Sequence, residues 1–248
     1  YEDTKLLLML KNIINNFFSF HFFLKTFNHL NKIKYFVQIG AHDGIMHDPL
    51  HQFLSKNEWS GVLVEPQKDM LKQFQERYKH RSNLLFYSLA AHPKKSTVEL
   101  ITVKNPTNYS QTGWATLITD RLSNNKNENE LEIINVEAMH LMKIIEHSGF
   151  EIIDLLQIDT EGFDYEILQM FNFELYKPLL VHYEYVHLSK IDYENSIKLL
   201  RKNGYKTIKK NSDIIALKKN RINVRFILIY IFFRIKASIS SRIRFFSN

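Results

Sequence analysis

Short apolar runs alternate with amphipathic segments between Tyr35 and Leu217, and this alternation constrains the fold more than any other feature. Runs of strand length occur at 35–39, 62–64, 84–89, 97–103, 153–158 and 179–185, and helical patterns at 50–56, 70–78, 138–147, 163–171 and 193–203. Strands that alternate with helices predict an α/β fold with a doubly wound, mostly parallel sheet. Two further runs, 205–208 and 214–217, predict a closing antiparallel hairpin.

Composition narrows the class of protein. Apolar residues make up 45% of the chain and charged residues 24%, which fits a globular protein and excludes a disordered one. The chain has no cysteine, so disulfides, thiolate metal sites and cysteine nucleophiles are excluded, and a cytoplasmic location is expected. Eight positive charges and no acid lie in residues 214–248, so the net charge of +7 leaves −1 on the other 213 residues. The body therefore shows no sign of a nucleic-acid-binding face.

The two ends differ from the middle of the chain. Residues 5–30 predict one or two amphipathic helices, so we expect a helical extension over 1–33, a main domain over 34–218 and a basic amphipathic helix over 219–248. The apolar run from Phe226 to Phe233 is too short to span a bilayer, which needs about 20 apolar residues. Three interpretations stay open for this tail: peripheral contact with a membrane surface, an oligomer contact, or packing on the N-terminal helix. Residues 104–130 are polar and predict a long loop, which is usually functional or mobile in a compact domain.

The first strand runs into a turn with two glycines, Gly40 and Gly44. A ligand can approach a backbone closely where side chains are absent, so this turn is a candidate binding site. It is neither the Gly-x-Gly-x-x-Gly of dinucleotide enzymes, which disfavours a nicotinamide-dependent oxidoreductase, nor a phosphate-binding P-loop. Glu65 ends the next strand, about 21 residues after Asp43, where an acid can accept hydrogen bonds from both hydroxyls of a ribose. A surface Glu before a turn is the alternative.

The strand at 153–158 ends in Asp159, Thr160, Glu161 and Gly162, followed by an amphipathic helix. Two carboxylates at the end of an apolar strand are costly unless they bind something. The segment LLQIDTEGFDYEIL resembles the Ile-Asp-x-Glu-Gly segment of FkbM-type methyltransferases. Three other segments, FVQIGAHDGIMHDPL, GVLVEPQ and HYEYVHLS, are similar to further blocks of that family in the same order, so the resemblance runs from about Tyr35 to Leu217.

The resemblance implies a Rossmann-like domain, S-adenosylmethionine as the cofactor and, usually, methylation of a hydroxyl oxygen. On its residue pattern, the turn would surround the methionine part of the cofactor, Glu65 would hold the ribose, and Ser88–Ala91 would flank the adenine. Many methyltransferases have an acid near the end of the first strand, where this chain has Gln38, so the partner of the cofactor's amino group is left open, with Asp43 as one candidate. The expected cofactor-binding residues are Gln38, Gly40, Ala41, Asp43, Gly44, Glu65, Pro66 and Ala90.

A hydroxyl acceptor must lose its proton to a side chain or through a metal. Neighbouring parallel strands should bring together Asp159, Glu161, Glu184 and His187, which are the candidate catalytic residues. In one interpretation Glu161, Glu184 or a nearby His is a general base. In another, Asp159 and Glu184 hold a divalent ion, as in catechol-type O-methyltransferases. In a third, the acids only cap the next helix and form an ion pair, because acids stabilise a helix N-terminus without catalysis.

The function expected from the sequence is therefore methyl transfer to a hydroxyl of a small molecule, sugar or glycan. The alternative is a binding module that keeps the fold and the cofactor but transfers nothing. Trp114 and the loop around it are expected either to cover the acceptor or to pack in the core.

Overall fold

The computed structural model describes residues 20–56, 59–118 and 130–218. Residues 34–218 lie in one compact unit, and residues 20–33 belong to a second. In the second unit, α2 (Phe20–Asn31) places Phe20, Phe23 and Phe27 on one side, with successive ring centroids 6.0 Å apart. This is the helical pattern expected for that stretch. The part of the prediction that falls on 1–19, and the helix expected over 219–248, lie outside the described residues.

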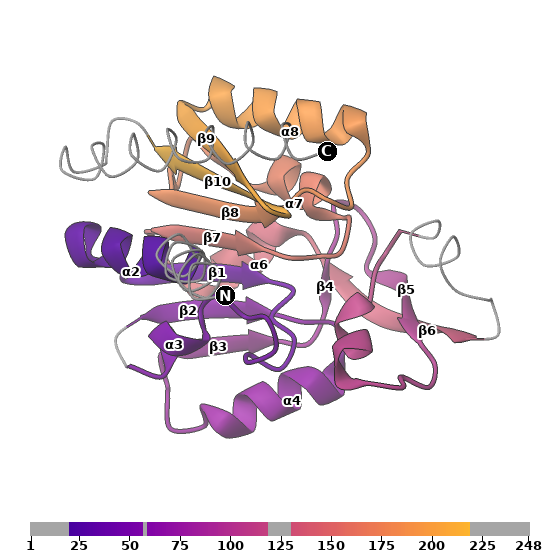
Figure 1. The fold of residues 1–248 in the computed structure, drawn as a ribbon. Coiled ribbons are helices and arrows are strands. Elements are labelled where there is room, and N and C mark those ends of the chain that lie inside the picture. The colour runs from indigo at the N-terminus through magenta and orange to yellow at the C-terminus, as the bar shows by residue number, and fades with distance from the viewer. Residues whose placement is uncertain (1–19, 57–58, 119–129, 219–248) are drawn as a thin grey trace, which may run out of the picture. The chain divides into compact units, whose positions relative to one another are not determined.

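The main unit is built on a seven-stranded sheet in the order β3-β2-β1-β7-β8-β10-β9 (Figure 1). Its five parallel strands are β1 (Tyr35–Ile39), β2 (Ser60–Val64), β3 (Leu84–Tyr87), β7 (Leu155–Ile158) and β8 (Leu180–Glu184). The strands β9 (Tyr205–Lys210) and β10 (Asp213–Lys218) form an antiparallel hairpin that pairs with β8. The predicted α/β fold with its mostly parallel sheet and closing hairpin is confirmed.

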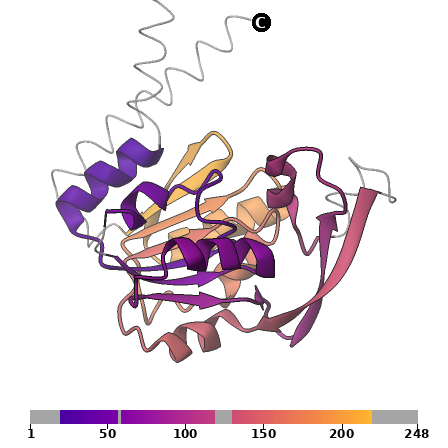
Figure 2. The same ribbon diagram turned by 90° about the horizontal axis from the view of Figure 1, so that it is seen from below.

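Helices cover both faces of this sheet because its strands are apolar on both sides. On one face, Val37, Ile39, Leu156 and Ile158 pack in a core with side chains of α6 (Leu141–Ser148), α7 (Asp164–Met170) and α8 (Lys190–Lys202). The other face carries α3 (His51–Leu54) and α4 (Lys68–Arg77). Figure 2 shows α4 and α6 on opposite sides of the strands. The sequence predicted all five of these helices.

A second, smaller sheet lies beside the carboxyl ends of the parallel strands (Figure 1). Its order is β4-β6-β5, with β4 (Ala90–Ala91), β5 (Thr97–Val103) and β6 (Leu131–Met139). The sequence predicts no strand at 131–137, because Glu132, Asn135 and Glu137 interrupt its apolar residues. In the structure the side chain of Ile133 on β6 is exposed. The helix expected from residue 138 begins at Leu141, since β6 continues to Met139. The segment expected to be a plain loop contains a 3-10 helix, η1 (Tyr109–Trp114).

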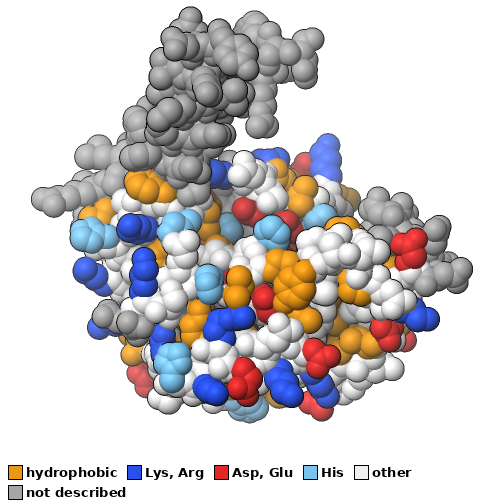
Figure 3. Space-filling view, turned by 60° about the horizontal axis from the view of Figure 1, so that its bottom comes forward, with side chains coloured by type: hydrophobic (Ala, Val, Ile, Leu, Met, Phe, Trp, Pro, Cys, Tyr) orange, Lys and Arg blue, Asp and Glu red, His pale blue; other side chains and the backbone are white. Residues whose placement is uncertain are grey.

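Charged side chains of both signs are interspersed on the face of the molecule shown in Figure 3. Hydrophobic side chains on that face lie in small groups among them. Within the part of the chain that the structure describes, no helix is long and apolar enough to cross a membrane. The absence of a nucleic-acid partner stays a prediction.

Candidate functional site

The turn after β1 brings the ends of three strands into contact. Gly40 has φ = +79°, and a Cβ at this position would lie 1.7 Å from the carbonyl oxygen of Asp159. The N–H groups of Gly40 and Ala41 donate to the carbonyl oxygen of Val64 at 2.9 and 3.1 Å, and Asp159 N–H donates to Ile39 O at 2.9 Å. Only glycine fits here, because both the backbone conformation and the available space exclude a side chain.

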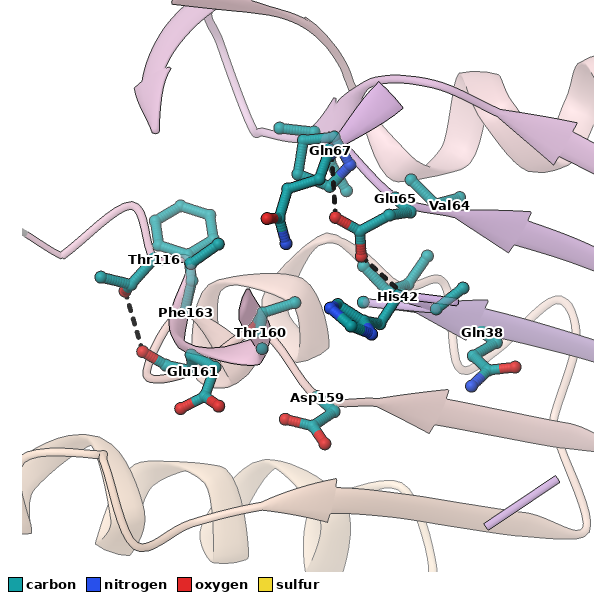
Figure 4. Close-up of a pocket in the computed structure, with 18 of the residues that line it drawn as sticks. Gln38, His42, Val64, Glu65, Gln67, Thr116, Asp159, Thr160, Glu161 and Phe163 are labelled. Atoms are coloured by element: carbon teal, nitrogen blue, oxygen red, sulfur yellow. Dashed lines mark hydrogen bonds between the residues drawn. The ribbon is translucent and has the colours of Figure 1, made fainter. Parts of the chain in front are cut away.

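Glu65 follows β2 and is 4% exposed. Its Oε2 accepts a hydrogen bond from the backbone N–H of His42 and its Oε1 one from that of Gln67, both at 2.9 Å (Figure 4). Burial raises the pKa of this carboxyl group, while the two backbone N–H groups act in the opposite direction. An ionised carboxylate has about four lone-pair sites, so two acceptor positions are left for a ligand.

A cavity opens over these strand ends, and six of the eight expected cofactor-binding residues line it: Gln38, Gly40, Ala41, Glu65, Pro66 and Ala90. Further lining comes from Leu89 and Ala91 and from Trp114, Thr116 and Leu117. Asp43 and Gly44 are not among the lining residues. The role of each residue in cofactor binding stays a prediction. Asp43 and Gly44 differ from the other six residues because they do not line the cavity.

Asp43 is occupied by the turn itself. Its Oδ1 accepts hydrogen bonds from the N–H groups of Ile45 and Met46, both at 2.9 Å, and its Oδ2 accepts one from the Tyr109 hydroxyl at 2.9 Å. Although burial alone would raise it, these hydrogen bonds lower the pKa of Asp43 to about 2. Burial, together with the hydrogen bond to Asp43 and the negative charge of that carboxylate, raises the pKa of Tyr109 to about 12. Asp43 thus fastens η1 to the turn.

The η1 segment forms one wall of the cavity and is held to the opposite wall by polar contacts. The Nε2 atom of His42 lies 3.0 Å from Thr112 Oγ1, and Gln67 Nε2 donates to Thr112 O at 3.1 Å. Trp114 lines the cavity, and its role in covering the acceptor stays a prediction. The contacts of Gln67 and Thr112 could not be predicted, because the sequence does not show which partner a single polar residue in a loop will contact.

Asp159 and Glu161 both line the cavity, beyond the end of β7 (Figure 4). Glu161 has φ = +56°, a strained conformation for a residue with a side chain, and its carbonyl oxygen accepts a hydrogen bond from Thr116 Oγ1 at 2.8 Å. Gly162 follows with φ = +110°, and a Cβ there would lie 3.4 Å from His187 O.

Glu184 and His187 lie next to Glu161 rather than in the cavity lining. His187 Nε2 is 3.4 Å from Glu161 Oε2 and 3.5 Å from Glu184 Oε2. One candidate ligand atom from each of these three residues lies within 4.8 Å of the others, a set that could hold a divalent ion. Asp159, which the sequence analysis paired with Glu184, is not a member of this set. Glu161 therefore connects the cavity to the group that we call the Glu161 cluster: Glu161, Glu184 and His187.

A buried carboxyl group, that of Asp164, accepts hydrogen bonds from the residues on either side of Glu161. It is fully buried, and its Oδ2 accepts hydrogen bonds from Thr160 Oγ1 at 3.0 Å and Gly162 N–H at 3.3 Å. Burial raises its pKa to about 6, although these hydrogen bonds lower it. In the sequence it looks like an ordinary acid in the first turn of a helix, so its role could not be predicted.

His182 does not join the Glu161 cluster, although it precedes Glu184 by two residues. Its Nδ1 lies 2.7 Å from Gln157 Oε1, and its Nε2 lies 3.6 Å from Asp213 Oδ2. Gln157 is also the register partner of Gln38 on β1. A row of buried polar side chains thus crosses the sheet from Gln38 through Gln157 to His182.

The sequence model of the FkbM methyltransferase domain matches residues 38–207, which is more than half of the chain. The chain belongs to the FkbM methyltransferase family. The matched region holds the turn after β1, Glu65, the Glu161 cluster and the cavity wall formed by η1. Its mostly parallel sheet is the Rossmann-like methyltransferase fold that the sequence predicted. No curated protein shows a significant sequence match to the chain.

The chain is similar to several solved structures at low identity. The chain is similar to the FkbM methyltransferase of Methylobacillus flagellatus, with 13% identity and a TM-score of 0.45, over 74% of this chain and 43% of that one. It is also similar to the Methanococcus jannaschii fibrillarin pre-rRNA processing protein (10% identity, TM-score 0.40, 75% and 66% of the chains). A third is the Geobacter metallireducens precorrin-6y C5,15-methyltransferase (9%, 0.36, 74% and 76%). The chain thus spans less than half the length of the Methylobacillus protein.

The FkbM domain implies S-adenosylmethionine as its cofactor, and three features of the cavity fit this molecule. Gly40 and Ala41 line the cavity where the turn after β1 passes it, and Gly40 contributes backbone alone. Glu65 presents a buried carboxylate that suits a ribose diol. Gln38 lines the cavity with a buried amide oxygen that has no hydrogen-bond partner among the described residues.

Proposed function

We propose that this FkbM domain is an O-methyltransferase that uses S-adenosylmethionine and acts on a hydroxyl group of a sugar, glycan or related metabolite. The observation that carries the proposal is the Glu161 cluster, which adjoins the cavity through Glu161. An oxygen acceptor must lose a proton during transfer, and this cluster offers a base at that place.

His187 is the base in this proposal. Its imidazole is partly exposed, with 35% of the side chain accessible, and it lies 3.4 Å from Glu161, which lines the cavity. Two carboxylates, each about 3.5 Å from Nε2, stabilise the positive charge that the ring gains when it takes the proton. Bound S-adenosylmethionine supplies an electrophilic methyl group, and the protein contributes mainly by holding the acceptor oxygen in line with it.

Glu65 and the turn at Gly40 bind the cofactor in this proposal, with Pro66 and Ala90 beside them. Trp114, Thr116 and Leu117, which also line the cavity, contact the acceptor in this proposal. The acceptor class rests on the resemblance to FkbM-type enzymes, which usually methylate hydroxyl oxygens. Peripheral contact of residues 219–248 with a membrane is part of this proposal, since clustered basic residues are attracted to anionic surfaces, and a lipid-linked saccharide is then one candidate acceptor.

A second mechanism uses a divalent ion on Glu161, Glu184 and His187 to acidify the acceptor hydroxyl. The ligand set is carboxylate and imidazole, which suits such an ion. Chelator separates the two mechanisms: activity that survives chelation supports His187 as the base, and activity restored only by added metal supports the ion.

The function is tested by binding and by turnover. We expect calorimetry to show binding of S-adenosylhomocysteine, and incubation of S-adenosylmethionine with a panel of saccharides to release S-adenosylhomocysteine. The variant His187→Gln should lower turnover by about 10²–10⁴-fold without changing S-adenosylhomocysteine affinity. His147→Gln, an exposed histidine on α6, is the matched control. Binding without transfer to any acceptor would favour the binding module, and no binding would refute the cofactor assignment.

A further inference from the structure

Gln38 and Asp48 form a polar pair in the wall of the cavity. Gln38 lies on β1 and is 2% exposed, and its Nε2 donates a hydrogen bond to Asp48 Oδ1 at 3.0 Å. The same Oδ1 accepts a second hydrogen bond, from Leu50 N–H at 2.8 Å. The Asp48 carboxylate and the Gln38 amide are therefore fixed in orientation by their contacts with each other and with the backbone.

Each member of this pair has a second oxygen without a partner. Gln38 Oε1 and Asp48 Oδ2 are buried atoms, and neither accepts a hydrogen bond from any residue that the structure describes. Reversing the Gln38 amide would not help, because its oxygen would then face Asp48 Oδ1, which is also an acceptor. Two acceptors that lack donors therefore belong to the wall of one cavity. Buried polar groups are nearly always satisfied, so a ligand is expected to supply the donors.

A cationic group with N–H donors fits this pair, because one of its two oxygens without a partner belongs to a carboxylate. Burial raises the pKa of Asp48 to about 6, although hydrogen bonds from Leu50 N–H and the Gln38 amide and the nearby His51 lower it. The imidazole of His51 is itself engaged, with Nδ1 2.9 Å from Gly44 O. A primary ammonium group carries three N–H donors and a positive charge, which matches one carboxylate oxygen and one amide oxygen.

We propose that Asp48 and Gln38 together bind the α-ammonium group of the methionine part of the cofactor. This inference rests on the proposed function, because it assumes that S-adenosylmethionine occupies the cavity. It gives the amino group a partner despite the absence of an acid at the end of β1, since Gln38 holds in place a carboxylate that comes from ten residues further along. Asp43 does not fill this role, because both of its oxygens accept hydrogen bonds within the protein and it does not line the cavity.

The test compares ligands that differ in the part of the cofactor at issue. S-Adenosylhomocysteine carries the α-ammonium group, its desamino analogue lacks only that group, and 5′-methylthioadenosine lacks the whole amino-acid end. Affinities for the three are measured by calorimetry on the full chain and on Asp48→Asn, which keeps the size of the side chain and one acceptor oxygen. Asp69→Asn, an exposed acid on α4, is the matched control.

We expect Asp48→Asn to weaken S-adenosylhomocysteine binding about tenfold or more, as for a lost charged hydrogen bond, and to change binding of the other two ligands less than twofold. The inference is overturned if the variant weakens all three equally, or leaves S-adenosylhomocysteine unaffected. If Asp48→Asn does not fold, Gln38→Met is measured instead, with a severalfold loss confined to S-adenosylhomocysteine as the supporting result and no such loss as the opposing one. If the unaltered chain binds none of the three, the proposed function fails and the inference falls with it. Normal binding with no ammonium effect leaves the proposed function standing and removes the inference alone.

Discussion

Glu65 Oε2 lies 2.9 Å from the backbone nitrogen of His42, and this hydrogen bond joins the end of β2 to the turn that follows β1. The other oxygen of the same carboxylate accepts from the N–H of Gln67. Glu65 therefore organises two loops of the cavity as well as facing its interior. A substitution that removes the Glu65 side chain would disturb both loops. The role of Glu65 in ligand binding is therefore better tested with a side chain of the same size.

The variant Glu65→Gln removes the charge but keeps one acceptor oxygen for the backbone. We expect it to weaken S-adenosylhomocysteine binding by about 1.5–3 kcal/mol, because a ribose diol loses a charged acceptor. Calorimetry measures the affinity, and Glu76→Gln on the exposed side of α4 controls for loss of an acid. An unchanged affinity would remove Glu65 from the ribose site.

The variant Gly40→Ala should destabilise the fold more than Gly149→Ala does. Both glycines have positive φ, +79° and +70°, which costs an L-residue about 1–2 kcal/mol. A Cβ on Gly149 meets nothing within 4 Å, whereas one on Gly40 meets Asp159 O at 1.7 Å. Overpacking adds about 1–3 kcal/mol or more at Gly40. Urea unfolding measures both, and equal losses would show that the turn adjusts freely.

The variant Asp164→Asn should change how stability depends on pH. The pKa of Asp164 is about 6 in the folded protein against an ordinary value of 3.8, so the folded state binds the proton more tightly than the unfolded state. Stability from this group is therefore greatest below about pH 4 and falls as pH rises through 6, by about 3 kcal/mol.

Asparagine carries no such charge, so the stability of Asp164→Asn relative to the unaltered chain should increase between pH 4 and pH 7. Chemical denaturation at a series of pH values provides the measurement, with Asp69→Asn as the control. A difference that is the same at every pH would mean that Asp164 does not carry the raised pKa.

The variant Tyr109→Phe should loosen η1 without unfolding the domain. It deletes the hydroxyl that donates to Asp43 Oδ2, while the ring remains. Amide hydrogen exchange within η1, including the Gln111 N–H that donates to Asn108 O, should become faster. Tyr185→Phe is matched to it, because that hydroxyl donates to Asn211 O in the β9–β10 turn and its loss should leave η1 unaffected. Equal exchange in η1 for both variants would refute the fastening role of Asp43.

Apolar periodicity made most of the fold predictable. The strands that end at Ile39, Val64 and Ile158 are mostly apolar, so the polar residues just after them could be located at one edge of the sheet. The strand β6 was not predicted because its apolar and polar residues follow no regular alternation. Its pairing with β4 and β5 leaves no mark in its own sequence.

Side-chain direction in the turns could not be predicted. His42 with φ = +45° and Glu161 with φ = +56° have left-handed backbone conformations, and sequence alone does not show that a His or Glu will adopt one. The sequence therefore did not predict that Asp43 is absent from the cavity lining, or that Glu161 rather than Asp159 lies next to His187. Asp48 was missed for a related reason, because its partner Gln38 lies on a strand and no sequence spacing records their contact.

The two walls of the cavity come from parts of the chain with different structural duties. One wall consists of strand ends locked together by Gly40, Val64 and Asp159, where a substitution disturbs the whole sheet. The other consists of η1 and the residues after it, which lie between β5 and β6 in the sequence and are attached by side-chain hydrogen bonds and by two backbone hydrogen bonds between Ile101 and Thr116. Under the proposed function, the length and side chains of the second wall then set which acceptor fits, while the strand ends of the first wall stay unchanged.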